Sequence, residues 1–265
     1  MIKHLMKPDK IRKFFPILPQ YNYYGKRLYK AGDNLYPSVT TVSTHERGDT
    51  FKKWREENPE KAKFAPDRGT IFHMFVEMYL DNNPLDKIES YARELEKKHE
   101  GQYYQNPATI ALKNLKTVIP LLDKLDSVFV QEVCLYSDLL KVAGRVDCVA
   151  KYNGKISIVD FKSGFKRKKD FWIKDYYIQT AAYSVMWKQM TGLDVEQLVL
   201  IVASDEDEIT EPVGVGEVFI QSPENWYGEL EKTIISFYQK YEYFKNVTIN
   251  NPKLVESDYT VNDLL

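Results

Sequence analysis

The second half of the chain alternates between strand-like and helix-like patterns of apolar residues. Three stretches rich in β-branched and aromatic residues are followed by an amphipathic helical stretch, two further strands and a closing helix. In order, these predicted elements span residues 128–136, 141–150, 155–161, 175–190, 197–203, 218–220 and 223–243. Asn153-Gly154 separates the second and third strands, and this dipeptide favours the tight turn of a β-hairpin. Strands and helices in this order predict an α/β fold, with helices packed against a mixed sheet.

The first half predicts a hairpin followed by a run of helices. Aromatic, strand-like stretches at 21–24 and 27–29 flank a turn at Gly25-Lys26, and a second turn at 31–34 leads into 36–42. Helical patterns follow, and prolines near their starts or gaps separate them. These helical patterns cover residues 49–58, 68–81, 85–100 and 106–124. We therefore expect a single domain (1–265) in four parts: a basic and aromatic arm with the hairpin (1–48), a helical cover (49–126), an αβ core (127–245) and a C-terminal tail (246–265).

Composition narrows the class of protein. With 265 residues, 43% of them apolar, the chain is long enough to bury one large core. No apolar run approaches the roughly 20 residues that cross a bilayer, so we expect no membrane partner. The two cysteines, Cys134 and Cys148, lie in apolar stretches and are interpreted as core residues in a reducing compartment. Two thiols are too few for the four that an iron–sulfur cluster normally requires, so that cofactor is not expected.

The distribution of charge says more than the net charge of −1. Residues 1–30 hold eight Lys or Arg and one Asp, interleaved with aromatic residues. Residues 162–174 hold six Lys or Arg and one Asp, again with aromatic residues among them, whereas acidic residues gather at 204–211. A nearly neutral chain can therefore present a basic face suited to nucleic acid.

The candidate chemistry centres on Asp147, Asp160 and Lys162. Asp147 and Asp160 lie on the two strands of the predicted Asn-Gly hairpin, and pairing around that turn brings their carboxylates to neighbouring positions. Clustered carboxylate oxygens are the ligands that Mg²⁺ or Mn²⁺ prefers. Lys162 follows Asp160 by two residues, so on a strand it points to the same face, where it can stabilise a pentavalent phosphate. The alternative interpretation is a buried Asp–Lys salt bridge that closes the hairpin.

Four other residues are candidates for the same site. Glu132, on the first predicted strand, is either a further carboxylate of the site or a surface residue of an edge strand. Gln179 and Tyr183 are spaced i, i+4 on a helix, so they share a face. They either position phosphate and water or fill the core. His73, on an apolar helix, is either a metal ligand oriented by Glu77 one turn later or a satisfied core histidine.

These residues resemble the motifs of a known family. Asp147, Asp160, Lys162 and the pair Gln179–Tyr183 are similar in order and spacing to the PD-(D/E)XK nucleases of the RecB-like type. The stretch Gly69-Thr-Ile-Phe-His73 looks like the histidine element of that subgroup. The closest resemblance is to mitochondrial genome maintenance exonucleases and their phage relatives, and it also rests on stretches 36–40, 144–156 and 159–163.

The resemblance implies a restriction-endonuclease-like core and Mg²⁺- or Mn²⁺-dependent cleavage of DNA, with a preference for single-stranded ends. It implies that His73, Asp147, Asp160 and the carbonyl of Phe161 are metal ligands and that Lys162 is catalytic. It places Gln179 and Tyr183 near the scissile phosphate. The role of Glu132 stays open, because its motif is less sharp than the others.

We therefore interpret the chain as a monomeric DNA exonuclease of replication, repair or recombination, for which any helicase or polymerase would be a separate partner. A strand that passes under the helical cover needs a free end, which favours exonucleolytic entry. The basic loop after the third strand is expected to guide DNA, and a solvated surface turn is the alternative. The loop's basic residues are Lys166, Arg167, Lys168 and Lys169.

Three alternatives to this interpretation differ in activity: a duplex-directed exonuclease, a structure-specific endonuclease and a non-catalytic DNA-binding protein on a nuclease scaffold. The last is disfavoured because Asp160 and Lys162 are both present. The basic residues 1–15 lack a secretory apolar stretch and make a poor transit peptide. We therefore expect the cytoplasm of a bacterium or phage-infected cell rather than the mitochondrial matrix.

Overall fold

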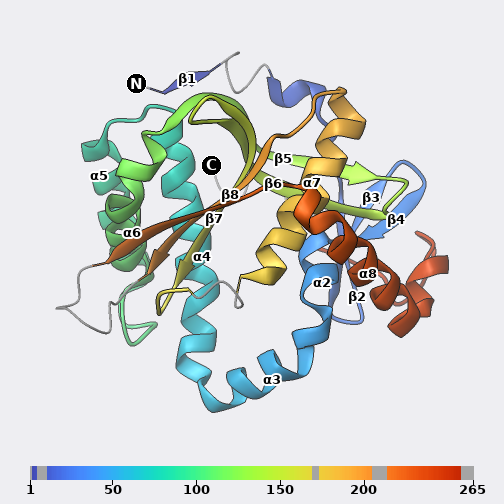
Figure 1. Ribbon diagram of the computed structural model, residues 1–265. Helices are drawn as coiled ribbons and strands as arrows, with labels where there is room; N and C mark the ends of the chain where they lie inside the picture. Colours follow the sequence, from blue (N-terminus) through green and yellow to red (C-terminus); the bar gives the residue numbers. More distant parts are fainter. Residues whose placement is uncertain (1, 5–10, 169–172, 205–213, 258–265) are drawn as a thin grey trace.

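A six-stranded mixed sheet forms the centre of the computed structural model (Figure 1), which describes residues 2–4, 11–168, 173–204 and 214–257. The strand order is β1-β5-β6-β7-β8-β9. The strands are β1 (Lys3–His4), β5 (Leu125–Ser137), β6 (Val142–Tyr152), β7 (Lys155–Gly164), β8 (Gln197–Ser204) and β9 (Val215–Gln221). β1–β5 and β7–β8 pair in parallel, whereas β5–β6, β6–β7 and β8–β9 pair antiparallel. The predicted mixed α/β sheet is therefore confirmed.

The hairpin between β6 and β7 turns at the predicted dipeptide. Tyr152 pairs with Lys155, and both turn residues have positive φ angles, 49° at Asn153 and 82° at Gly154. Positive φ at both central positions is the requirement of a type I′ turn, which asparagine and glycine meet at the lowest cost. The turn thus sets the register that brings Cys148 opposite Val159, and these two residues are the immediate neighbours of Asp147 and Asp160.

Helices cover both faces of this sheet. α4 (Pro59–Leu80), α5 (Leu85–Lys98) and α6 (Pro107–Leu122) pack on one face, around Phe72, Phe75 and Leu115, which are fully buried. α7 (Lys174–Thr191) and α8 (Glu224–Lys240) pack on the other, with α7 linking the parallel strands β7 and β8. Every residue of β8 is buried, as expected of a strand covered on both sides. None of the helices in the described part of the chain combines the length and apolarity that a membrane span requires.

The N-terminal part builds a second sheet beside the first. Its order is β10-β2-β3-β4, all antiparallel. The strands are β2 (Gln20–Tyr23), β3 (Lys26–Ala31), β4 (Asn34–Pro37) and β10 (Val255–Glu256). The predicted hairpin is therefore part of a larger sheet, which the C-terminal segment completes. Short helices α2 (Val39–Ser43), η2 (His45–Arg47) and α3 (Gly48–Glu57) then lead to α4. The chain also holds η1 (Arg12–Phe14) and η4 (Glu242–Asn246).

The helical segment differs from expectation in two respects. α4 begins at Pro59 and runs through Pro66, whereas the sequence pattern indicated a start at residue 68. Pro59 occupies the first turn, where a missing N–H is tolerated, while Pro66 lies inside the helix and the apolar packing of the later turns holds the helix together. In addition, α4 lines the site described below, whereas α6 packs against the far strands β8 and β9.

Candidate active site

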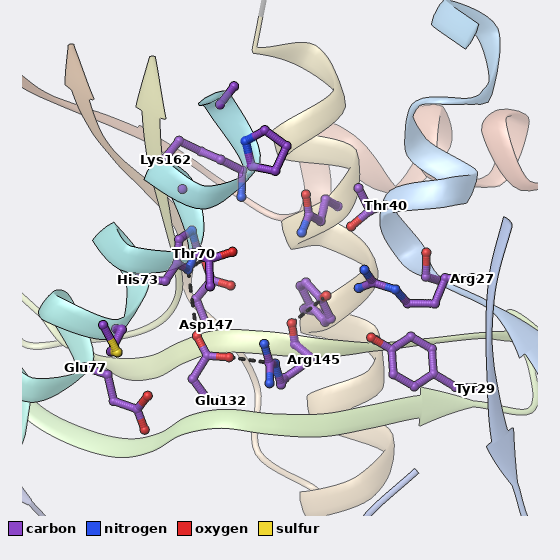
Figure 2. Close-up of a pocket in the computed structure, with 18 residues that line it drawn as sticks. Arg27, Tyr29, Thr40, Thr70, His73, Glu77, Glu132, Arg145, Asp147 and Lys162 are labelled. Atoms are coloured by element: carbon purple, nitrogen blue, oxygen red, sulfur yellow. Dashed lines mark hydrogen bonds and ion pairs between the residues drawn. The ribbon is translucent and has the colours of Figure 1, made fainter. Parts of the chain in front are cut away.

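A cavity of about 370 Å³ lies between α4, the N-terminal sheet and the middle of β5 and β6 (Figure 2). α4 forms one wall, α2 and β3 form the opposite wall, and α7 contributes side chains from behind the strands. The cavity is lined by Arg27, Tyr29, Ser38, Thr40, Ala65, Pro66, Gly69, Thr70, His73, Met74, Glu77, Glu132, Gly144, Arg145, Asp147, Lys162, Gln179 and Tyr183. Charged groups of both signs therefore meet in one concave site, which is typical of a catalytic pocket.

Glu132 and Asp147 lie opposite each other on β5 and β6. The neighbouring pairs Gln131–Cys148 and Val133–Val146 fix this register. Glu132 has a φ of 51°, in the left-handed region that a non-glycine residue rarely adopts inside a strand. Backbone strain of this kind is retained where the surrounding structure imposes it, and it is common at functional sites.

His73 joins these two carboxylates from α4. Its Nδ1 atom lies 3.6 Å from Asp147 Oδ2 and 3.8 Å from Glu132 Oε1. Burial lowers the pKa of His73, but the charges of Asp147 and Glu132 outweigh burial and leave the pKa above its usual value. One ligand atom from each of the three residues lies within 4.8 Å of the others. The structure thus assembles a His–Glu–Asp cluster from a helix and two strands.

Asp147 also holds the third strand in place. The paired positions of β6 and β7 end at Cys148–Val159, and beyond them the Phe161 N–H donates to Asp147 Oδ2 at 2.9 Å. A side chain here takes the place of a ladder partner, which lets β6 and β7 separate without losing a hydrogen bond. The resemblance implied the Phe161 carbonyl as a metal ligand, and that role stays a prediction, because the hydrogen bond to Asp147 uses the N–H of Phe161 and not its carbonyl.

Asp160 and Lys162 form a buried ion pair beside the cluster. Lys162 Nζ lies 2.6 Å from Asp160 Oδ1, and the side chain of Asp160 is 2% exposed. Burial raises the pKa of Asp160 to about 6 even though Lys162 opposes the shift. Burial alone lowers the pKa of Lys162, but Asp160 and Asp147 raise it above its ordinary value, so the ammonium stays charged. Of the two, Lys162 reaches the cavity wall, whereas Asp160 lies behind it.

Gln179 and Tyr183 face the cavity from α7, as their spacing predicts. The Tyr183 hydroxyl donates to the Arg145 carbonyl at 2.8 Å, and burial raises its pKa well above the usual value. A Cβ atom on Gly144 would lie 2.6 Å from the Tyr183 oxygen. Glycine at position 144 is therefore required for the tyrosine to seat against the strand that carries Asp147.

The structure brings together most of the residues that the sequence singled out. His73, Glu132, Asp147, Lys162, Gln179 and Tyr183 all line one cavity, and Asp160 adjoins it through Lys162. The basic loop begins beside them. Arg167 Nε contacts Glu217 Oε1 at 3.2 Å on β9, and the Lys168 side chain packs on Gly164. Lys169 lies outside the described residues.

Six other polar residues of the cavity were given no individual role from the sequence: Arg27, Tyr29, Ser38, Thr40, Thr70 and Arg145. Arg145 Nε contacts Glu132 Oε2 at 2.7 Å, and its spacing of two from Asp147 on a strand is a signal that could have indicated it. Arg27 and Tyr29 come from β3, more than one hundred residues before Glu132 and Asp147 in the chain, and no local pattern links them to the site.

The cluster fits a hard divalent cation. Two carboxylates and one imidazole within a few ångströms provide oxygen and nitrogen donors of the kind that Mg²⁺ or Mn²⁺ accepts. Asp160 Oδ2 is buried and makes no hydrogen bond within the described part of the chain, so this oxygen is a further donor close by. His73, Glu132 and Asp147 would hold the ion, with Asp160 next to them. A bound divalent ion lowers the pKa of water and neutralises charge on phosphate.

Comparison with known families agrees with this chemistry. The family model of the PD-(D/E)XK nuclease superfamily matches residues 45–246, a span that contains every residue of the site from His73 to Tyr183. The match covers well over half of the chain, which therefore belongs to the PD-(D/E)XK nuclease superfamily. Nucleases of this superfamily use divalent metal ions and act on DNA.

Among solved structures, the crystal structure of a putative exonuclease from Eubacterium rectale is similar to this chain. The two share 14% sequence identity with a TM-score of 0.43, over 72% of this chain and 73% of that one. The assignment to the superfamily rests on the family model. A search of the curated proteins found no match.

Proposed function

We propose that this protein is an Mg²⁺- or Mn²⁺-dependent exonuclease that hydrolyses phosphodiester bonds at the ends of single-stranded DNA. The observation that supports this most is the His73–Glu132–Asp147 cluster, with ligand atoms within 4.8 Å, next to the Lys162 ammonium in one cavity. A metal site beside a fixed cation is suited to stabilising the charge that develops on a phosphate under attack.

The chain's own groups have separate tasks in this proposal. Lys162 is held at 2.6 Å by Asp160, so its charge is already in position before substrate arrives and little reorganisation is needed. Arg145, paired with Glu132, orients that carboxylate toward His73. Arg27 enters the cavity from the wall opposite His73, where a guanidinium can bind a phosphate of the substrate strand.

The size and walls of the cavity favour a single strand. At about 370 Å³ the cavity is at the small end of the range for ligand pockets, a size that suits part of a single strand better than a duplex. α4 closes one side and the N-terminal sheet the other. A strand that lies between two such walls enters most readily by its end, which supports exonucleolytic action.

The test compares labelled linear single strand, linear duplex and closed single-stranded circle, each with Mn²⁺, with Mg²⁺ and with chelator. We expect metal-dependent loss of the linear single strand and survival of the circle. The variant Asp147→Ala should abolish cleavage while leaving DNA binding in chelator largely intact, because Lys and Arg make the phosphate contacts. Rapid cutting of the circle would favour an endonuclease instead.

The Lys162→Ala variant tests the catalytic role of the ammonium. Loss of a fixed charge beside the transition state should lower the rate by roughly 10²–10³. The salt-bridge interpretation predicts a different result, namely reduced thermal stability with unchanged specific activity.

A further inference from the structure

An exposed patch of aromatic rings and lysines lies where the β2–β3 hairpin tip meets the chain after α8. We call it the Tyr24–Tyr243 surface, and its members are Tyr24, Lys26, Lys240, Tyr241, Tyr243 and Lys253. The Tyr24 and Tyr243 rings lie 5.3 Å apart, and the Tyr241 and Tyr243 rings 6.0 Å apart. Residues more than two hundred positions apart thus form one continuous surface, close to the ends of β2 and α8 in Figure 1.

The outer rings of this surface are open to solvent. Tyr24 is 55% exposed and Tyr243 is 42% exposed, whereas Tyr23 and Phe244 beneath them are buried. Each outer ring packs against an inner ring, which holds it in place. The ring centroids lie 4.7 Å apart for Tyr24 and Tyr23 and 4.9 Å apart for Tyr243 and Phe244. Tyr23 and Phe244 therefore make the contacts with the core, and the rings of Tyr24 and Tyr243 keep much of their surface accessible to a partner.

The hairpin tip itself disfavours an aromatic residue. Tyr24 has a φ of 49° and Gly25 a φ of 73°, the signs required at the two central positions of a type I′ turn. Asparagine and glycine adopt this conformation most easily, and a tyrosine in it is conformationally costly. The turn therefore presents a large ring to solvent at the position where a small polar residue is the usual choice.

Lysines surround the rings. Lys253 Nζ lies 4.8 Å from the Tyr24 ring centroid, and Lys26 and Lys240 lie 4.6 and 5.5 Å from that of Tyr241. The acidic residue between the two tyrosines, Glu242, contacts Lys245 at 3.3 Å. Exposed rings with ammonium groups beside them match a polymer of stacked bases joined by phosphates, because bases stack on the rings and phosphates bind the lysines.

The surface adjoins the cavity through consecutive residues of β3. Lys26 contacts Tyr241, while Arg27, the next residue, lines the cavity. Successive side chains of a strand point to opposite faces, so the two sites lie on opposite faces of the N-terminal sheet, at the end where β2 turns into β3. A flexible polymer in the cavity at Arg27 would reach the rings by passing around the tip of the β2–β3 hairpin.

We propose that the Tyr24–Tyr243 surface is a second binding site for single-stranded DNA, on which the strand outside the cavity stacks its bases while its end is processed. This proposal rests on the proposed function, which places the end of the strand in the cavity. The consequence is an affinity that rises with DNA length until the strand reaches the surface.

The test measures binding of oligothymidylates of increasing length by fluorescence anisotropy in chelator, so that no cleavage occurs. The Tyr24→Leu/Tyr243→Leu double variant should bind the long strands about tenfold more weakly or worse, by loss of stacking, and bind the shortest strand as the wild type does. The Tyr24→Phe/Tyr243→Phe double variant keeps the rings and should retain the length dependence. Tyr227→Leu, an exposed tyrosine near the start of α8, is the matched control.

An unchanged length dependence in the leucine variant overturns the proposal. So does an equal loss for short and long strands accompanied by a lower melting temperature, because that result identifies a structural role. If the leucine variant does not fold, Lys26→Gln/Lys253→Gln tests the same surface, and the slope of log Kd against log salt should become shallower only for long strands. Cleavage of the shortest strand in Mn²⁺ is measured separately, so failure of the nuclease activity is distinguished from failure of this surface.

Discussion

Two glycines of the site show how single residues shape it in opposite ways. Gly144 lies against Tyr183, and a methyl group there would come within 2.6 Å of the hydroxyl. Gly69 also lines the cavity, in the middle of α4. Apart from its chain neighbours and the nearby backbone of the helix, no described atom would lie within 4 Å of a Cβ atom at this position. A glycine inside a helix destabilises it by roughly 0.5–1 kcal/mol relative to alanine. We therefore expect Gly69 to leave space for a substrate, and this expectation can be tested.

Substituting Gly69 by alanine should separate stability from activity. We expect Gly69→Ala to raise the free energy of unfolding by about 0.5–1 kcal/mol, through helix propensity, and to raise KM for single-stranded DNA, because the methyl group enters the cavity. Gly144→Ala should instead lower stability by about 1–3 kcal/mol through overpacking against Tyr183. Urea denaturation and steady-state cleavage of both variants provide the comparison. A Gly69→Ala enzyme with unchanged KM would show that the substrate does not approach this turn of α4.

At the level of elements, β7 connects the chemistry to the basic loop. The strand carries Asp160 and Lys162, remains paired with β8 as far as Gly164, and then leads directly into residues 165–168. The side chain of Lys168 packs against Gly164. Burial lowers the pKa of Lys168, and the positive charges of Arg68 and Arg47 lower it further. The loop thus begins within a few residues of Lys162, and it concentrates positive charge there.

Neutralising Lys166, Arg167, Lys168 and Lys169 together tests whether this loop guides DNA. Each phosphate contact releases counterions, so the variant should bind single strands more weakly and with a shallower salt dependence. Turnover at saturating DNA should change far less, since none of the four is assigned a chemical role. The matched control neutralises four cations of α5: Lys87, Arg93, Lys97 and Lys98. Equal salt slopes for the wild type and the loop variant would remove the loop from the DNA path.

At the scale of the whole molecule, the His73–Glu132–Asp147 cluster joins the helical layer to the central sheet. His73 comes from the helical layer on one face of the sheet, and Glu132 and Asp147 come from two of its central strands. An ion bound to all three would link these elements in the folded state and have no such site in the unfolded chain. Metal binding should therefore stabilise the entire domain.

Thermal unfolding in Mn²⁺ and in chelator measures this linkage. At a metal concentration of about 100 times Kd the stabilisation should be about 2.7 kcal/mol, which raises the melting temperature by several degrees. His73→Ala should lose much of the metal-induced shift and require more metal for half-maximal cleavage. His99→Ala, at the end of α5, should keep the full shift. A wild-type protein whose melting temperature is the same in metal and in chelator would contradict the assignment of these three ligands.

The sequence by itself determined the order and type of the core elements. The strands predicted at 128–136 and 155–161 match β5 and β7 with ends shifted by at most three residues, and the Asn153-Gly154 turn is where the hairpin turns. This succeeds because apolar periodicity and turn chemistry act between near neighbours in the chain. The same locality brought out Asp160 with Lys162, two apart on a strand, and Gln179 with Tyr183, one helical turn apart.

Only the tertiary structure decided which groups meet across elements. It places Glu132, whose own backbone is in the left-handed region, beside His73 and pairs its carboxylate with Arg145. It also brings Arg27 into the cavity from a separate sheet. It also turns residues 24 and 243 into one surface, although neither local pattern refers to the other. Such contacts depend on how complete layers pack, and packing is a property of the folded chain that no short window of sequence contains.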